Sequence, residues 1–180
     1  MTRIIKRYTG DLALTRDEYD RLISVADNFE DRLLLMIGCC TGMRRSDIVR
    51  LKLENINFDR HEISYQEKKK GDKIRTVPIP QRLETELKLY EVEQKRKTGN
   101  IFSFKDRQSW NRFAALCDKA GVTRRPIHSM RSTAISFLIS AGFSVAESAK
   151  IIGDTESTVF QHYIGASSMY LNDKMRMVVV

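Results

Sequence analysis

Apolar residues recur at helical spacing over most of the chain and alternate with polar ones only in two short segments near its middle. Residues 15–26 open with a Thr15/Glu18 capping box and continue with apolar positions three and four apart, which predicts an amphipathic helix. The stretch between the cap residue Asn28 and Gly42 is apolar on every side. Because a helix without a polar face is normally buried, we expect this second helix to lie at the centre of the domain.

Two strands are predicted in the middle of the chain, at residues 61–67 and 73–79, where apolar and polar residues alternate. Between them, the segment Lys68–Lys73 is expected to form a hairpin tip that carries several positive charges. Pro78 and Pro80 end the second strand, because proline has no backbone N–H to donate to a neighbouring strand. The pattern therefore predicts one small antiparallel sheet.

Helical spacing also predicts the remaining elements. They are a short helix capped by Ser46, a charged helix at about 81–97, a helix at about 106–120 with Trp110 on its inner side, a helix with Pro126 in its first turn that stops at Gly142, a helix opened by a Ser144/Glu147 capping box, and a last helix that is capped by Asp154 or Thr155 and runs to Tyr163. With about eight helices and one small antiparallel sheet, the expected fold is mainly α (α+β).

These elements fit one domain of ordinary size. Residues 1–14 show no clear period and are expected to be an arm or a linker remnant, residues 15–165 to be the folded domain, and residues 166–180 to be a tail. No window approaches the length of a transmembrane helix, and the three cysteines lack metal-ligand spacing. We therefore expect a soluble, cytoplasmic protein with reduced cysteines in its core and neither a metal site nor a cofactor.

The charge balance points to a polyanionic partner. The chain has 31 Lys and Arg residues against 23 Asp and Glu residues, a net charge of +8, and its isoelectric point is about 9.5. Nucleic acid is the first partner that such a balance suggests, and an anionic membrane surface is the second. Solvated surface lysines are the alternative that charge alone leaves open.

A set of polar residues spread along the chain suits chemistry on a phosphodiester. In order, they are Arg44, Lys70, His128, Arg131 and Tyr163. Two guanidiniums can hold the non-bridging oxygens of a phosphate, and a lysine or an imidazole can transfer a proton. A tyrosine hydroxyl can attack phosphorus and remain bound as a covalent intermediate. Taken singly, each residue also has a structural interpretation, as part of a solvated turn, a solvated hairpin or the core.

These residues and their surroundings resemble the catalytic domain of the tyrosine recombinases, of the phage integrase and Xer type. The segment Thr41–Ile48 is similar to the first-arginine motif of that family, and Lys70–Pro78 is similar to the hairpin that carries its lysine. His128–Arg131 matches the His-x-x-Arg motif, and Tyr163 stands at the position of the nucleophile. The resemblance covers about residues 12–170 and keeps the motifs in the family's order.

The resemblance implies stepwise cleavage and religation of double-stranded DNA without metal or ATP. Tyr163 would form a 3′-phosphotyrosyl link, and Arg44 and Arg131 would bind the scissile phosphate. Lys70 would protonate the 5′-oxygen, with His128 assisting proton transfer. The resemblance also implies a tetrameric assembly on DNA with exchange of C-terminal tails, and a nucleoid-associated protein of prokaryotic, viral or mobile-element origin.

Two features depart from the family pattern. Asp154 stands where the family usually has His or Trp, and it is either a residue of the phosphate site or the N-cap of the last helix. No segment is long enough for the N-terminal core-binding domain that the family's integrases usually carry. These departures keep a second hypothesis open, a DNA-binding accessory or regulatory protein with little or no cleavage activity. A relative of the type IB topoisomerases is the third hypothesis.

The remaining expectations concern residues around the catalytic set. Contacts to the DNA backbone are expected from Arg45, Lys69, Lys73 and Arg125. Tyr170 is the rival nucleophile, and His162 is expected at the surface.

Overall fold

The computed structural model describes residues 12–67, 71 and 73–162. In chain order the elements are α1 (Arg16–Ser24), α2 (Phe29–Thr41), α3 (Arg45–Ile48), the 3-10 turn η2 (Leu53–Asn55), β1 (Ile56–Asn57), β2 (Glu62–Glu67), β3 (Lys73–Pro78), α4 (Gln81–Gln94), α5 (Asp106–Lys119), α6 (Ser129–Ser140) and α7 (Val145–Ile152). Residues 156–162 are also helical. The mainly α fold with one small antiparallel sheet is confirmed. None of the described helices combines the length and hydropathy of a membrane span.

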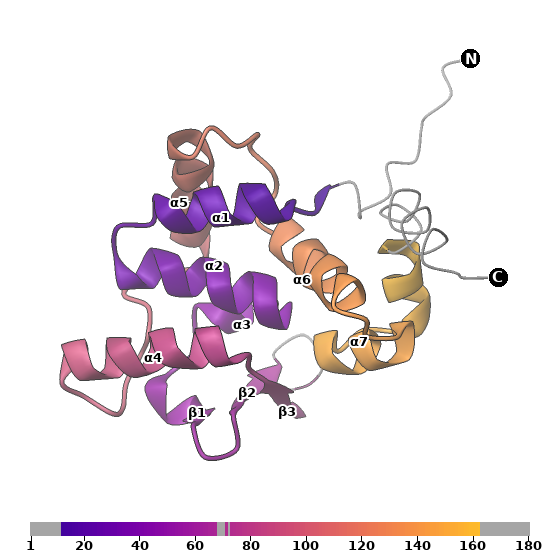
Figure 1. The fold of residues 1–180 in the computed structure, drawn as a ribbon. Coiled ribbons are helices and arrows are strands. Elements are labelled where there is room, and N and C mark those ends of the chain that lie inside the picture. The colour runs from indigo at the N-terminus through magenta and orange to yellow at the C-terminus, as the bar shows by residue number, and fades with distance from the viewer. Residues whose placement is uncertain (1–11, 68–70, 72, 163–180) are drawn as a thin grey trace.

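Helix α2 lies at the centre of the molecule, as its apolar sequence predicts. Every residue from Leu33 to Cys39 is buried, and α2 contacts α1, α3, α4, α5 and α6. Figure 1 shows it running between α1 and α4, with its C-terminal end toward α6. The Asn28 side chain accepts a hydrogen bond from the amide of Asp31, so the predicted N-cap is confirmed.

The sheet has the order β1–β2–β3, and both pairings are antiparallel. Its third strand, β1, was not predicted because two residues are too few to show alternation. Tyr65 of β2 stands opposite Arg75 of β3, so the two side chains leave the same face of the sheet. Helix α4 is joined to the turn before β2 by a hydrogen bond between Glu84 and His61, and Lys88 of α4 lies over the ring of Phe58 in that turn.

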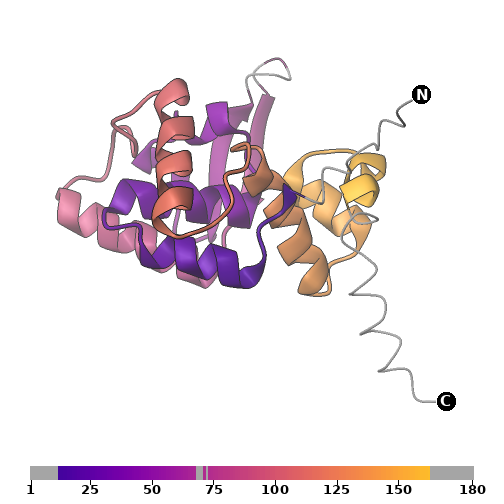
Figure 2. The same ribbon diagram turned by 90° about the horizontal axis from the view of Figure 1, so that it is seen from above.

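The described core consists of two hydrophobic clusters. The larger one fills the space between α1, α2, α4, α5 and the sheet. The smaller one joins α6, α7 and the helical residues 156–162, and its buried members are Ala134, Ile135, Ile139, Ala149, Ile152 and Val159. Figures 1 and 2 show these three helices gathered at one side of the molecule. The C-terminal helices therefore form a group with a small core of their own.

Three details of the predicted elements are wrong. Arg44, rather than Ser46, occupies the N-cap position of α3, because the helix begins at Arg45 and Ser46 lies within its first turn. Trp110 is 47% exposed, although its spacing places it on the same side of α5 as the buried Phe113 and Cys117. Helix α6 begins at Ser129, so Pro126 precedes the helix; its carbonyl accepts a hydrogen bond from the Ser129 amide.

Replacing Gly42 by alanine is expected to destabilise the fold strongly. Gly42 has a left-handed φ of 64°, and a Cβ there would lie 2.3 Å from Cδ1 of Ile152. The left-handed conformation costs about 1–2 kcal/mol for a residue other than glycine, and overpacking adds about 1–3 kcal/mol. The loss is measured as the free energy of unfolding in urea.

The matched control is Gly71→Ala, because Gly71 has a similar φ of 73° and no heavy atom of the described residues lies within 4 Å of the added Cβ. It should show only the backbone cost of about 1–2 kcal/mol. Equal losses for the two variants would contradict a close packing of Ile152 on the Gly42 turn.

Candidate functional site

The turn after α2 places Arg44 between the helices and the sheet. Gly42 ends α2 in the left-handed conformation, and Arg44 follows in an extended conformation before α3 begins. The Arg44 guanidinium forms an ion pair with Glu67, the last residue of β2. Both side chains are largely removed from solvent. The turn thus directs a guanidinium toward the base of the lysine-bearing hairpin.

Arg131 lies in the first turn of α6 and is 4% exposed. Its Nη1 donates to the carbonyl oxygen of Gly42 at 2.6 Å, and its Nη2 donates to Oδ2 of Asp154 at 2.9 Å. A buried guanidinium requires such partners, since an unpaired buried charge is strongly destabilising. Arg131 therefore joins α6, the end of α2 and the turn after α7 at one point.

The charges around this point influence one another. Burial lowers the pKa of Arg131, Asp154 partly offsets this effect, and the positive charges of Arg44 and Arg75 lower the pKa further. The guanidinium still stays protonated near neutral pH. Partial burial alone would raise the pKa of Asp154, but hydrogen bonds from Arg131 and the Thr155 amide lower it below its ordinary value. Asp154 is therefore a carboxylate at neutral pH.

Asp154 does not act as the N-cap of the last helix, so that interpretation is wrong. The cap is Thr155, the alternative, whose Oγ1 accepts a hydrogen bond from the Thr158 amide at 3.2 Å. Asp154 accepts a hydrogen bond from the adjacent amide of Thr155 at 3.0 Å, whereas an N-cap side chain accepts from an amide two or three residues further on. Its other oxygen is held by Arg131. Asp154, the residue that departs from the family pattern, therefore contacts Arg131, one of the two arginines of the candidate site.

Two histidines flank the site. His128 occupies the N-cap position of α6 and is exposed, one turn before Arg131 as predicted. His162 was expected at the surface, and this is wrong: it is 6% exposed. Burial lowers its pKa, and the nearby His128 lowers it further. The spacing of three from buried Val159 was the available signal, because residues at i and i+3 share a helix face.

Two charged residues that the sequence pattern does not single out also belong to this region. Glu67 pairs with Arg44. Arg75 of β3 donates from Nη2 to the carbonyl oxygens of Lys150 and Ile151 in the last turn of α7. The signal for Arg75 was its alternation with Val77, which places both on the inner face of the strand.

The predicted DNA contacts are spread over separate elements. Arg45 pairs with Asp106 of α5 at 2.8 Å, and Lys73 begins β3 in an exposed position. Arg125 pairs with Glu18 of α1 at 2.8 Å, and its side chain is 17% exposed. Their contacts with DNA stay predictions. Four other residues of interest, Lys69, Lys70, Tyr163 and Tyr170, lie outside the described residues.

Within the part of the chain that the structure describes, no group of three or more His, Cys, Asp or Glu side chains could hold a metal ion. The three cysteines are free thiols; Cys39 and Cys117 are buried, and Cys40 is partly buried. Their expected place in the core is confirmed for the two buried ones.

Comparison with known sequences assigns this arrangement to a family. The model described as the phage integrase family matches residues 13–168. Tyrosine recombinase XerA of Pyrococcus furiosus is 30% identical over 174 residues, which cover 89% of this chain and 59% of the relative. Tyrosine recombinase XerD of Listeria innocua is 24% identical over 180 residues, covering 89% of this chain and 60% of the relative. The chain thus spans less than two thirds of the length of these relatives.

Solved structures share the fold. The crystal structure of XerA recombinase superposes with a TM-score of 0.74 at 19% identity, covering 90% of this chain and 63% of the other. The catalytic domain of bacteriophage HP1 integrase gives a TM-score of 0.67 at 21% identity, covering 92% of this chain and 94% of the other. With a family match over most of its length and this fold, the chain belongs to the phage integrase family and has the fold of a tyrosine recombinase catalytic domain.

Proposed function

We propose that residues 15–165 form the catalytic unit of a site-specific DNA recombinase that cleaves and rejoins strands through a 3′-phosphotyrosyl intermediate. The observation that carries this proposal is the joining of Arg131 to the Gly42 turn that presents Arg44, in a chain of this family. Two guanidinium forks meeting at one turn suit the non-bridging oxygens of a single phosphate. The net charge of +8 suits DNA as the partner.

In the proposed reaction, the Tyr163 hydroxyl oxygen bonds to phosphorus while the bond from phosphorus to the 5′-oxygen breaks. Lys70 gives a proton to the departing 5′-oxygen, and His128 assists removal of the tyrosine proton. Arg44 and Arg131 stabilise the negative charge that gathers on the non-bridging oxygens. Religation is the reverse attack by a 5′-hydroxyl. Since the phosphate ester is kept as phosphotyrosine, the proposed cycle needs no ATP, and the two arginines and Lys70 would take the electrostatic role that a metal ion otherwise has.

Both arginines are paired with carboxylates when DNA is absent. Glu67 holds Arg44, and Asp154 holds Arg131. An incoming phosphate must replace or rearrange these partners, because a carboxylate beside a phosphate is repelled. This observation favours the second candidate function, a DNA-binding accessory or regulatory protein with weak or no cleavage activity.

We extend the proposal to double-stranded DNA as the partner and to self-association on it as a tetrameric synapse. Among the structural neighbours are XerH bound to its palindromic difH substrate, with a TM-score of 0.73, and a lambda integrase dimer bound to a COC′ core site, with a TM-score of 0.67. A protein acting on chromosomal or phage DNA in this way would be associated with the nucleoid.

The first prediction from the proposed function concerns the nucleophile. Tyr163→Phe removes the oxygen that forms the covalent link, so it should abolish covalent adduct on nicked suicide DNA. The affinity for that DNA should stay within twofold of wild type. Adduct is read on a denaturing gel, and affinity is read by fluorescence anisotropy.

Tyr170→Phe is the matched control and should form adduct like wild type. Adduct that persists in Tyr163→Phe and disappears in Tyr170→Phe would identify Tyr170 as the nucleophile. Tight DNA binding by wild type without any adduct would support the accessory-protein hypothesis.

A second prediction concerns Asp154. Asp154→His removes the carboxylate that competes with phosphate and supplies a donor at the position where the family usually has one. Since loss of one such donor slows known enzymes by about 10²–10³-fold, we expect adduct formation to become at least tenfold faster. An unchanged or slower rate would show that Asp154 does not oppose phosphate binding.

Asp154→Asn separates the structural cost from the catalytic gain. Arg131 loses its carboxylate partner, so the DNA-free variant should be less stable than wild type at pH 7. Because the pKa of Asp154 is lowered in the folded state, this difference should be complete above about pH 4 and be lost as the pH falls through the lowered pKa. Equal stability of the two proteins at pH 7 would contradict the ion pair.

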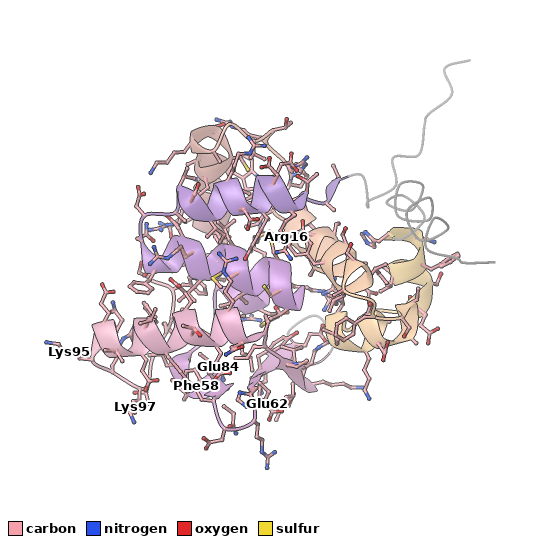
Figure 3. The ribbon with its side chains drawn as sticks, viewed as in Figure 1. Arg16, Phe58, Glu62, Glu84, Lys95 and Lys97 are labelled. Carbon is pink, nitrogen blue, oxygen red and sulfur yellow. The ribbon has the colours of Figure 1, made fainter. Side chains whose placement is uncertain are left out.

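A third prediction concerns affinity. If binding rests mainly on phosphate contacts, the logarithm of the association constant should fall linearly with the logarithm of the salt concentration. The slope should be roughly −0.9 per phosphate neutralised. Lys73→Ala should make the slope shallower by about 0.9. Lys97→Ala is the control, since Figure 3 shows Lys97 on the side of the molecule away from α6 and α7. A nearly flat salt dependence for wild type would contradict the proposed mode of binding.

A further inference from the structure

We propose that Arg75 is a positioning residue that fixes the turn between α7 and the helical residues 156–162 against the sheet. The proposed nucleophile, Tyr163, directly follows that helical stretch, so the catalytic consequence rests on the function proposed above. The structural part of the inference stands on the DNA-free protein alone.

The first observation is the contact between β3 and the end of α7. Arg75 Nη2 donates to the carbonyl oxygens of Lys150 at 2.9 Å and Ile151 at 2.5 Å. The last carbonyls of a helix lack amide partners within the helix, and a positive charge is favourable at that end of the helix dipole. Arg75 therefore caps α7 from another part of the chain.

The second observation is the fit of the guanidinium against Gly153. A Cβ at Gly153 would lie 0.8 Å from Nη1 of Arg75 and 1.9 Å from its Cζ. The guanidinium thus fills the place that any side chain at this position would take. Gly153 also has a left-handed φ of 72°, which glycine adopts without steric penalty. Glycine at position 153 therefore provides both the left-handed turn and the space that the Arg75 guanidinium occupies.

The third observation is the weak internal support of the segment. Helix α7 has eight residues, too few to be stable alone, and the cluster that it shares with α6 and residues 156–162 has six buried members. The larger cluster supports the sheet, including Val77 of the same strand as Arg75. Arg75 therefore connects a small, marginal unit to a large, stable one.

The turn that Arg75 fixes carries the functional geometry. Asp154 follows Gly153 and places its carboxylate on Arg131, and Thr155 starts the helix toward Tyr163. If the turn moves, the nucleophile and the phosphate-binding arginine lose their relative position. Small displacements of reacting groups slow a reaction greatly without weakening substrate binding to the same extent.

Hydrogen exchange on the DNA-free protein tests the structural part. In Arg75→Ala, amides of residues 150–158 should exchange at least tenfold faster, while amides of α2 keep their wild-type rates. Arg75→Lys should restore protection only in part, because its ammonium can donate to the same carbonyls but lacks the planar group that packs at Gly153. The charge control is Arg60→Ala, which removes an exposed arginine from the turn before β2 and should leave these amides unchanged. Unchanged exchange at 150–158 in Arg75→Ala would overturn the inference.

A double-mutant cycle tests the match between Arg75 and Gly153. In wild type, Gly153→Ala displaces the guanidinium and strains the backbone, whereas in an Arg75→Ala background only the strain remains. The loss in melting temperature from Gly153→Ala should therefore be clearly smaller in the Arg75→Ala background. Equal losses in both backgrounds would overturn the inference.

Single-turnover cleavage tests the catalytic consequence. Arg75→Ala should slow adduct formation at least tenfold with DNA affinity within twofold of wild type, and Arg60→Ala should do neither. A substrate with sulfur in place of the bridging 5′-oxygen needs no proton on its leaving group. It should restore Lys70→Ala but leave Arg75→Ala slow. Restoration of Arg75→Ala would overturn the inference by assigning the arginine to the lysine hairpin.

The same experiments separate this inference from the proposed function. If wild type forms no adduct on any substrate, the proposed function fails, while exchange and the mutant cycle still decide whether Arg75 holds the turn. If wild type is active and Arg75→Ala has wild-type rates of both exchange and cleavage, only the inference about Arg75 fails.

Discussion

The arrangement of the candidate site depends on one requirement, which is that the buried guanidinium of Arg131 needs hydrogen-bond acceptors. Arg131 is almost completely removed from water, and a charge in that position is tolerated only when hydrogen-bond acceptors surround it. Its acceptors are the carbonyl at the end of α2 and the carboxylate after α7. Meeting this requirement brings the Arg44 turn, α6 and the segment leading to Tyr163 to one place. The candidate site is thus assembled by the same contacts that stabilise the C-terminal helices.

Close packing around two glycines makes this assembly possible. Gly42 lets Ile152 of α7 approach the end of α2, and Gly153 leaves room for the guanidinium of Arg75. Each glycine also adopts a left-handed conformation that reverses the chain. The two turns on which the site is built therefore combine a backbone requirement with a packing requirement. Residues with side chains would conflict with both.

The charges of the site are balanced before any DNA arrives. Glu67 and Asp154 each neutralise one of the two arginines proposed to bind phosphate. This balance reduces the cost of burying positive charge in the free protein, but it also places two carboxylates where a polyanion would have to bind. In the proposed function, binding of DNA would therefore require an exchange of anions at the arginines. The same feature connects the two candidate functions, since strong pairs would favour binding without cleavage.

The sequence by itself determined the elements whose signals are local. Caps such as Asn28 and the Ser144/Glu147 box involve residues three apart, and the apolar run of α2 follows directly from composition, so both were predicted correctly. The order of the motifs was enough to identify the family. The burial of His162 also had a local signal, its spacing of three from Val159, which the prediction missed. Only the tertiary structure decided that Asp154 pairs with Arg131 and that Arg75 caps α7. These outcomes depend on contacts between residues that are far apart in the chain, and periodicity and capping rules carry no information about which distant side chains will meet.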